Sequence, residues 1–283
     1  MQYNIDENLC KGIYRPRPEH SHKGTFGKLL TVCGCTEMPG ASGMVALGAL
    51  RSGVGILKVA GVKNVCDFVA SRFLEPIYCP CESDALSDNM SGFVGDCTAA
   101  VIGCGSGRSE QTERCVLALL GSGKPLIVDA DGIIALKKHK DVLHSGVIIT
   151  PHPKEMAGLL ECDISKVLEN PVKTASDFSK KYGCVVLLKG ADTVVASQDG
   201  DVYINSMPNS GMAKGGSGDL LAGIIGSFAA QGYSPLNAAV MGVYLHSRAG
   251  EKCRQKYGEE GMLPSDIPNY FKAVLDFLKE NNA

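Results

Sequence analysis

The sequence has no excess of charge and no long run of either sign. Its 283 residues include 28 Lys and Arg and 30 Asp and Glu, which gives a formal net charge of −2. Proteins that bind nucleic acid or anionic lipid usually concentrate basic residues in one segment or on one face. The balance of charge therefore argues against nucleic acid or a membrane surface as a standing partner.

Long apolar stretches are also missing. No uninterrupted apolar run is long enough to span a bilayer, and the opening MQYNIDENLCKGIYRPRPEH lacks the basic-then-apolar layout of a signal peptide. These absences predict a cytoplasmic protein. No linker, repeat or low-complexity segment divides the chain. Because the composition is ordinary for a globular protein, 45% hydrophobic and 20% charged, we interpret residues 1–283 as one domain.

The twelve cysteines lack the spacing of common metal motifs. The close pairs Cys33/Cys35 and Cys79/Cys81 have CxC rather than CxxC spacing, and no pair of histidines stands near them. Buried free thiols in a reducing cytosol are the favoured interpretation, and a structural zinc or iron–sulfur site is the alternative.

Short apolar runs alternate with helical patterns along the chain. The runs are continuously apolar, which is typical of strands buried on both faces of a parallel sheet. The residues after 190 read instead as two short strands around Asp199-Gly200, a hairpin signal. The pattern predicts an α/β fold, a three-layer sandwich whose mostly parallel central sheet has helices on both faces and an antiparallel edge. The predicted strands are 28–34, 55–61, 98–105, 125–131, 146–153 and 184–190, and the predicted helices include 41–52, 109–121, 153–161 and 165–182.

Polar or glycine-rich segments follow four of these strands. They are Gly103–Gly107, Asp129 with Asp131, TPHPKE at 150–155 and KGADT at 189–193. In sheets of this kind ligands bind at the carboxyl ends of the strands. The four segments therefore predict one shared cleft.

The stretch NSGMAKGGSGD, residues 209–219, joins four glycines to an acid just before an apolar helix. Its glycines let successive N–H groups turn inward, and a helix that begins near Ser217 adds its positive end, which together favour a phosphate ligand. A carboxylate beside that anion, Asp219, fits a base that accepts the proton of a hydroxyl attacking phosphorus. The alternative is a glycine-rich turn with an acidic helix start.

The familiar nucleotide-binding loops are absent. Neither GSGKP at 121–125 nor GTFGKL at 24–29 completes the GxxxxGK[ST] pattern, and GCGSG at 103–107 is not GxGxxG. A nicotinamide dehydrogenase of Rossmann type is therefore weakly supported.

Three side chains at the strand ends are candidates for ligand contacts. His152, fixed between two prolines, is placed to contact a substrate, and Glu155 to hold Mg²⁺ through water. The alternative for Glu155 is a favourable acid in the first turn of a helix. Lys189 ends a buried strand, where its charge meets either a ligand phosphate or water.

Taken together, these stretches resemble the ADP/ATP-dependent NAD(P)H-hydrate dehydratases of the ribokinase-like superfamily. The matching segments run in order over nearly the whole chain: HKGTFGKLLTVCG, GASGMVALGALRSGVG, VIGCGSGRSEQT, LIVDADGI, IITPHPKEMAGLL, VVLLKGADTVVA, GMAKGGSGDLLAGIIGSFAAQG and GMLPSDIP.

The resemblance implies a lyase of metabolite repair. Such an enzyme phosphorylates the ring hydroxyl of NADH hydrate or NADPH hydrate with ADP or ATP and Mg²⁺, then eliminates phosphate to restore the dinucleotide. It also implies a homo-oligomer, with a tetramer as one form. On the substrate side it implies contacts from Ala41, Gly105, Gly107, His152 and the catalytic Asp219. On the nucleotide side it implies contacts from Lys189, Gly190, Ala191, Asp192, Thr193 and Gly218, which join Gly215, Gly216 and Ser217 of the predicted cradle.

The sequence departs from the family pattern at several positions. Cys104 replaces the proline of a glycine-proline-glycine turn, and Lys214 stands where a small or hydroxyl residue is usual. His152 occupies the place of an asparagine that wider relatives carry three residues before the metal-site glutamate, which suits a substrate role. The epimerase domain of some members is absent, so no epimerase activity is expected.

Two other functions stay open on the sequence. A kinase of the same fold acting on a vitamin precursor such as pyridoxal or hydroxyethylthiazole would share the GGSGD chemistry, but TPHPKE and GASG favour the dehydratase. A non-catalytic dinucleotide sensor would not need the base at Asp219.

Overall fold

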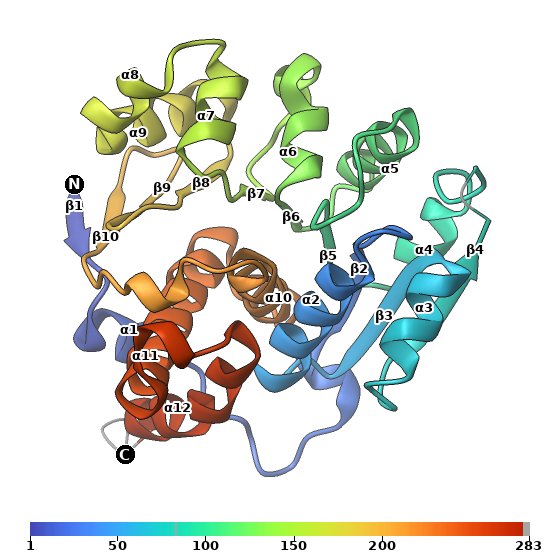
Figure 1. Ribbon diagram of the computed structural model, residues 1–283, viewed down its shortest axis with the longest axis horizontal. Helices are drawn as coiled ribbons and strands as arrows, with labels where there is room; N and C mark the ends of the chain where they lie inside the picture. Colours follow the sequence, from blue (N-terminus) through green and yellow to red (C-terminus); the bar gives the residue numbers. More distant parts are fainter. Residues whose placement is uncertain (83, 280–283) are drawn as a thin grey trace.

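The computed structural model describes residues 1–82 and 84–279, which form a sheet with helices on both faces (Figure 1). The strand order is β1-β10-β9-β8-β7-β6-β5-β2-β3-β4. Neighbouring strands are parallel except that β9 is antiparallel to both β8 and β10. The strands are β1 Gln2–Asn4, β2 Lys28–Val32, β3 Ile56–Val62, β4 Ile77–Cys81, β5 Ala99–Ile102, β6 Leu126–Val128, β7 Val147–Ile149, β8 Val185–Leu188, β9 Thr193–Ala196 and β10 Val202–Asn205.

The helices pack on the two sides of this sheet, α1, α2 and α10–α12 on one side and α5–α9 on the other (Figure 1). The α-helices are α1 Glu7–Ile13, α2 Pro39–Arg51, α3 Lys63–Ala70, α4 Met90–Val94, α5 Glu110–Gly121, α6 Asp131–Ala135, α7 Pro153–Leu160, α8 Ile164–Glu169, α9 Pro171–Tyr182, α10 Ser217–Ala230, α11 Pro235–Gly261 and α12 Phe271–Lys279. The 3-10 helices are η1 Lys23–Phe26, η2 Leu136–Lys138, η3 Lys140–Val142, η4 Ser210–Met212 and η5 Pro264–Tyr270. The predicted three-layer α/β sandwich with a mostly parallel sheet is confirmed.

Alternate residues of each central strand enter two separate hydrophobic cores. In β5, Ala99 and Val101 belong to the core that also includes residues of α2, α10 and α11, whereas Ala100 and Ile102 belong to the core that includes residues of α5, α6, α7 and α9. Because side chains alternate across a strand, a sheet covered on both faces needs apolar residues at every position. This is why the strands read as continuous apolar runs.

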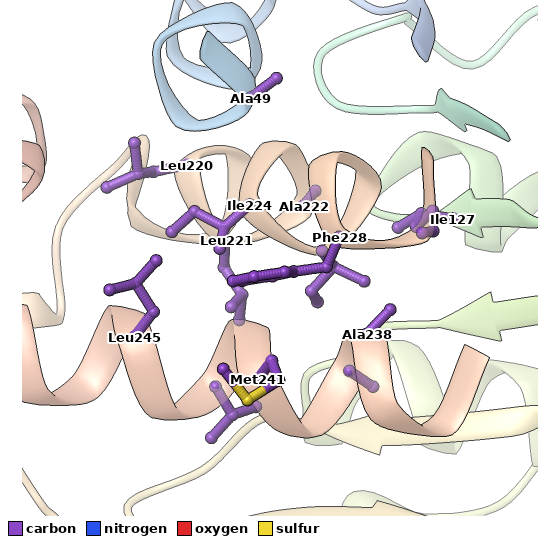
Figure 2. Packing of buried hydrophobic residues seen from close by; sticks show 14 of the residues in the cluster. Ala49, Ile127, Leu220, Leu221, Ala222, Ile224, Phe228, Ala238, Met241 and Leu245 are labelled. Carbon is purple, nitrogen blue, oxygen red and sulfur yellow. The ribbon is translucent and has the colours of Figure 1, made fainter. Parts of the chain in front are cut away.

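Helix α10 is central to one layer, and twelve of its fourteen residues are buried. Leu221, Ile224 and Phe228 face α11, where Met241 and Leu245 lie opposite them, and Ala49 of α2 lies on the other side (Figure 2). Glycines bring α2 and α10 into backbone contact: a Cβ on Gly223 would lie 2.1 Å from the Val45 carbonyl oxygen. This packing holds the start of α10 at the carboxyl ends of the strands.

The predicted helix over 165–182 is wrong, because the chain forms two helices there, α8 and α9. Asn170 between them has φ −146° and ψ 74°, and its side-chain oxygen accepts a hydrogen bond from Lys173 N at 3.0 Å. A residue before proline avoids the helical region, and Asn is a favoured N-cap. The Asn170-Pro171 pair therefore ends one helix and starts the next.

Strands β1 and β4 were not predicted, because both lie at sheet edges and carry exposed residues rather than an apolar run. The predicted hairpin around Asp199-Gly200 is confirmed as β9 and β10.

All twelve cysteines are free thiols, eight of them buried and four half-buried. Among the described helices, none is long and apolar enough to cross a membrane.

Candidate functional site

Three of the four predicted strand-end segments meet around one cavity of ≈ 580 Å³, whereas the fourth, KGADT at 189–193, does not line it. Its wall includes Ala41 from α2, Gly105 after β5, Glu155 from α7 and Asp219 from α10. These residues are far apart in the chain and come together because β5, β6 and β7 are neighbours whose carboxyl ends share an edge. Four of the predicted site residues therefore line a single space.

The first turn of α10 presents backbone N–H groups without a side-chain cap. Gly216 is the N-cap, with φ 94°, a conformation that favours glycine. The Leu220 N–H donates to the Gly216 carbonyl at 2.9 Å, so the N–H groups of Gly218 and Asp219 precede the first bond of the helical ladder. The turn over 215–219 has the geometry of an anion cradle at a helix N-terminus.

An ion pair between the buried Asp129 and the partly buried Lys189 lies next to this turn. Lys189, just after β8, places its Nζ 2.7 Å from Asp129 Oδ1, and the Thr150 hydroxyl donates to the same oxygen at 2.7 Å. A Cβ on Gly218 would lie 3.5 Å from the Lys189 Nζ. Although burial acts against both charges, the attraction of the pair holds the pKa of Asp129 below and that of Lys189 above its usual value. The ammonium is therefore a fixed positive charge beside the cradle.

Asp219 is a strengthened base. Burial, followed by the nearby Asp129 carboxylate, raises its pKa from 3.8 to about 6. The Cys104 thiol donates to Asp129 Oδ2 at 3.5 Å, and ligand atoms of Cys104, Asp129 and Asp219 lie within 4.8 Å of one another. Asp219 is thus ionised at neutral pH and still a better proton acceptor than an ordinary carboxylate.

His152 and Glu155 form a reciprocal cap at the start of α7. The His152 Nδ1 accepts from the N–H groups of Lys154 at 3.1 Å and Glu155 at 3.3 Å, and Glu155 Oε2 accepts from His152 N at 2.8 Å. The acceptor role of Nδ1 leaves the ring proton on Nε2, which is 3.4 Å from Glu155 Oε1. Glu155 both caps the helix and lines the cavity, and burial raises its pKa. The His152 ring is half-exposed beside it.

The loop after β5 owes its shape to glycines. Gly103, Gly105 and Gly107 all have positive φ, and a Cβ on Gly105 would lie 2.7 Å from the Cβ of Ala41. Gly105 thus lets the loop reach the start of α2. Gly107 lies at the wall of a second cavity of ≈ 360 Å³ instead, and its N–H donates to Asp131 Oδ2 at 2.9 Å.

The turn between β6 and α6 is strained. Ala130 has φ 49° and ψ −119°, a conformation that residues other than glycine rarely adopt and that is typical of functional sites. The carboxylates on its two sides have different partners. Asp129 accepts a hydrogen bond from Lys189, whereas Asp131 accepts one from the Gly107 N–H in the loop after β5. The strained residue, Ala130, thus lies between two carboxylates that have different partners.

Other predicted residues lie outside the main cavity. Gly190, Ala191 and Asp192 form an exposed turn that leads into β9 at Thr193. Lys214, which the sequence left without a role, donates from Nζ to the Glu260 and Met262 carbonyls, both at 2.6 Å. Its ammonium therefore ties the segment before α10 to the end of α11 and to Met262 after it.

Sequence reasoning missed several contributors to the site. Asp129 had been noted only as a polar strand end, and its partner Thr150 only as part of TPHPKE. His246 of α11 gave no signal, because a histidine inside an apolar helix is usually structural. It is buried, its Nε2 lies 3.5 Å from the Ser217 hydroxyl, and burial lowers its pKa to about 4. His246 is therefore a neutral support behind the cradle.

Known proteins similar to this chain share its fold and sequence over nearly its whole length. The family model described as NAD(P)H-hydrate dehydratase matches residues 29–272. A bifunctional NAD(P)H-hydrate repair enzyme of Moorella thermoacetica is 36% identical over 96% of this chain and 53% of its own length. An ADP-dependent (S)-NAD(P)H-hydrate dehydratase of Neisseria meningitidis is 32% identical over 90% of this chain and 87% of its own.

A solved structure gives the same result. The ADP/ATP-dependent NAD(P)H-hydrate dehydratase of Bacillus subtilis, co-crystallised with ATP/Mg²⁺, has a TM-score of 0.85 and 26% identity, with 98% of each chain covered. The chain spans about half the length of the bifunctional relatives that it matches and most of the length of the dehydratase from Neisseria.

Proposed function

This chain belongs to the NAD(P)H-hydrate dehydratase family, and we propose that it restores NADH and NADPH from their hydrates with ADP or ATP. The observation that carries the proposal is the position of Asp219. It stands in the first turn of α10, between an anion cradle on one side and the 580 Å³ cavity on the other. A base at that position can accept the proton of a hydroxyl that attacks a phosphoryl group.

The chemistry divides between the two sides of Asp219. Its carboxylate accepts the proton of the ring hydroxyl as the hydroxyl oxygen bonds to the terminal phosphorus, and the shortened nucleotide leaves. Inorganic phosphate then leaves the ring, a proton departs from the neighbouring carbon, and the ring double bond re-forms. The N–H groups of Gly218 and Asp219, which precede the first bond of the helical ladder, and the Lys189 ammonium then face the charge on the transferring group.

The residues at the site fit a magnesium ion. Mg²⁺ prefers oxygen ligands and keeps several waters, and Glu155, which lines the cavity, would hold it through water. When bound, Mg²⁺ neutralises charge on the nucleotide phosphates. The related enzyme of Bacillus subtilis was co-crystallised with ATP/Mg²⁺, which supports both ligands for this chain.

We divide the remaining predicted residues between those that contact the hydrate and those that contact the nucleotide. Ala41, Gly105, Gly107 and His152 are proposed to contact the hydrate, and the first two lie on the cavity wall. Lys189, Gly190, Ala191, Asp192 and Thr193 are proposed to contact ADP or ATP with the cradle, since Lys189, which directly follows β8, places its Nζ 3.5 Å from the position of a Cβ on Gly218. We further propose one domain over 1–283 that acts in the cytoplasm as a homo-oligomer, and the twelve free thiols support a reducing compartment.

The function is tested by recovery of dihydronicotinamide absorbance. The purified protein is mixed with NADH hydrate or NADPH hydrate, Mg²⁺ and either ADP or ATP. We expect absorbance to return, with one phosphoryl group consumed for each dinucleotide restored. Stable phosphorylation of pyridoxal or a hydroxyethylthiazole without any such recovery would instead identify a vitamin kinase.

Variants of His152 distinguish its role as a helix cap from its proposed role as a substrate contact. We expect His152→Ala to reduce kcat/KM for the hydrate by roughly 1–3 kcal/mol, the scale of one lost buried polar contact, with little change in nucleotide affinity. Because the ring also caps α7, this variant should lose about 1 kcal/mol of folding stability. His152→Asn keeps a good N-cap, so it should lose activity without losing stability. Weaker ADP or ATP binding with unchanged use of the hydrate would reverse the assignment.

A further inference from the structure

The wall of the main cavity carries more acidic than basic side chains. Glu37, Asp131, Glu155 and Asp219 contribute four carboxylates. Among the residues that the structure describes, Arg108 is the one basic side chain on this wall. On a wall of this composition, Arg108 is the side chain whose charge attracts an anion.

Arg108 is held through its Nε atom rather than through its two terminal nitrogens. Its Nε lies 3.4 Å from Asp131 Oδ1, while the other oxygen of Asp131 accepts the Gly107 N–H at 2.9 Å. The side chain is 73% exposed, and within residues 1–82 and 84–279 the guanidinium makes no other hydrogen bond or ion pair. Its two terminal nitrogens are thus free to make the paired hydrogen bonds that guanidinium groups form with phosphate.

The position of Arg108 places it on the hydrate side of the catalytic base. It lines the same cavity as Ala41, Gly105 and Asp219, whereas Lys189 and the glycines of 215–218 are not on that wall. The nucleotide phosphates therefore have their own cation in Lys189. Arg108 faces whatever molecule fills the cavity.

We propose that Arg108 binds a phosphate of the dinucleotide substrate. This inference rests on the proposed function, because a hydrate of NADH or NADPH carries a diphosphate bridge, and the NADPH form adds a 2′-phosphate. Either group would give Arg108 an anion inside an otherwise acidic cavity. Arg108 is then a binding residue for the substrate and takes no part in proton or phosphoryl transfer.

The test compares Arg108→Ala with Arg114→Ala. Arg114 lies on α5 six residues further on, is 62% exposed and pairs with Glu110 at 3.4 Å, so its removal matches the change in net charge and in surface ion pairing. We expect Arg108→Ala to raise KM for the hydrate roughly 10- to 100-fold, as for a lost charge-assisted contact. The kcat value and the KM for ADP or ATP should be unchanged. Arg108→Lys should lie between, because an ammonium lacks the paired donors.

The two hydrates distinguish the two phosphates. An equal rise in KM for NADH hydrate and NADPH hydrate assigns Arg108 to the diphosphate, and a rise for NADPH hydrate alone assigns it to the 2′-phosphate. Unchanged KM for both, an equal effect of Arg114→Ala, or a rise only for ADP or ATP would overturn the proposal.

A second measurement separates this inference from the proposed function. Calorimetric binding of NADH and of NADPH to the wild type and to Arg108→Ala needs no turnover. An inactive wild type that binds both dinucleotides through Arg108 would refute the repair activity and retain the contact. An active wild type whose dinucleotide affinity does not change in Arg108→Ala would refute the contact alone.

Discussion

Asp219→Asn should lower kcat by roughly 10²–10⁴, the range for removal of one general base. The change keeps the size of the side chain and the start of α10 but removes the proton acceptor. Because phosphoryl transfer is loose and moves the proton late, the loss should lie toward the lower end. Affinity for ADP or ATP should persist or increase, since a negative charge beside the cradle is lost. Turnover close to the wild-type rate would refute the catalytic role.

The pH dependence provides a check on the same residue. The ionised carboxylate is the base, and its pKa is about 6, so wild-type kcat/KM should rise with pH through about 6 and then level off. In the folded protein the raised pKa favours the protonated form. Wild-type stability should therefore fall as pH rises from about 4, near the unfolded value of 3.8, to about 6.

The Asp219→Asn variant lacks this titration. Relative to the wild type it should gain roughly 1–3 kcal/mol of folding stability at pH 7, and less at pH 4. Denaturant unfolding at the two pH values measures the difference. An equal difference at both would show that Asp219 titrates normally in the folded protein.

Gly218→Val should strongly weaken nucleotide binding while the fold persists. A Cβ at this position meets the Lys189 Nζ at 3.5 Å and Asp129 Oδ2 at 3.7 Å, both ordinary contacts. The two methyl groups of valine would instead cover the ammonium and the adjacent N–H groups. Loss of about two charge-assisted hydrogen bonds corresponds to roughly 10²–10⁴-fold weaker binding of ADP or ATP.

Graded variants show whether bulk is the cause. Gly218→Ala adds only the Cβ and should reduce affinity much less than valine. Gly12→Val, in α1 where a Cβ meets nothing within 4 Å, measures the cost of valine in a helix alone. Calorimetric titration with ADP and thermal unfolding of all three variants are required. Normal ADP affinity in folded Gly218→Val would show that phosphate does not approach this turn.

Much of the site was accessible from sequence because its signals are local. Glycines before Ser217, a carboxylate at 219 and two prolines around His152 each restrict the backbone within a few residues, and all of them lie at strand ends or helix starts. Parallel strands place their carboxyl ends on one edge, so the meeting of these segments could also be predicted. The break at Asn170 was equally local, and its Asn-Pro signal was overlooked.

The local sequence also determined the apolar strands, the glycine-rich turns and the helix caps, since each depends on the conformational range of neighbouring residues. The pairing of Asp129 with Lys189, 60 residues apart, and the contact of His246 with Ser217 depend on strand order and on the packing of α10 against α11. The basicity of Asp219 has the same origin, because burial and a second carboxylate set its pKa. Sequence fixes which groups are present at each strand end, but only the tertiary structure decides which charges lose their water and which partner each one meets.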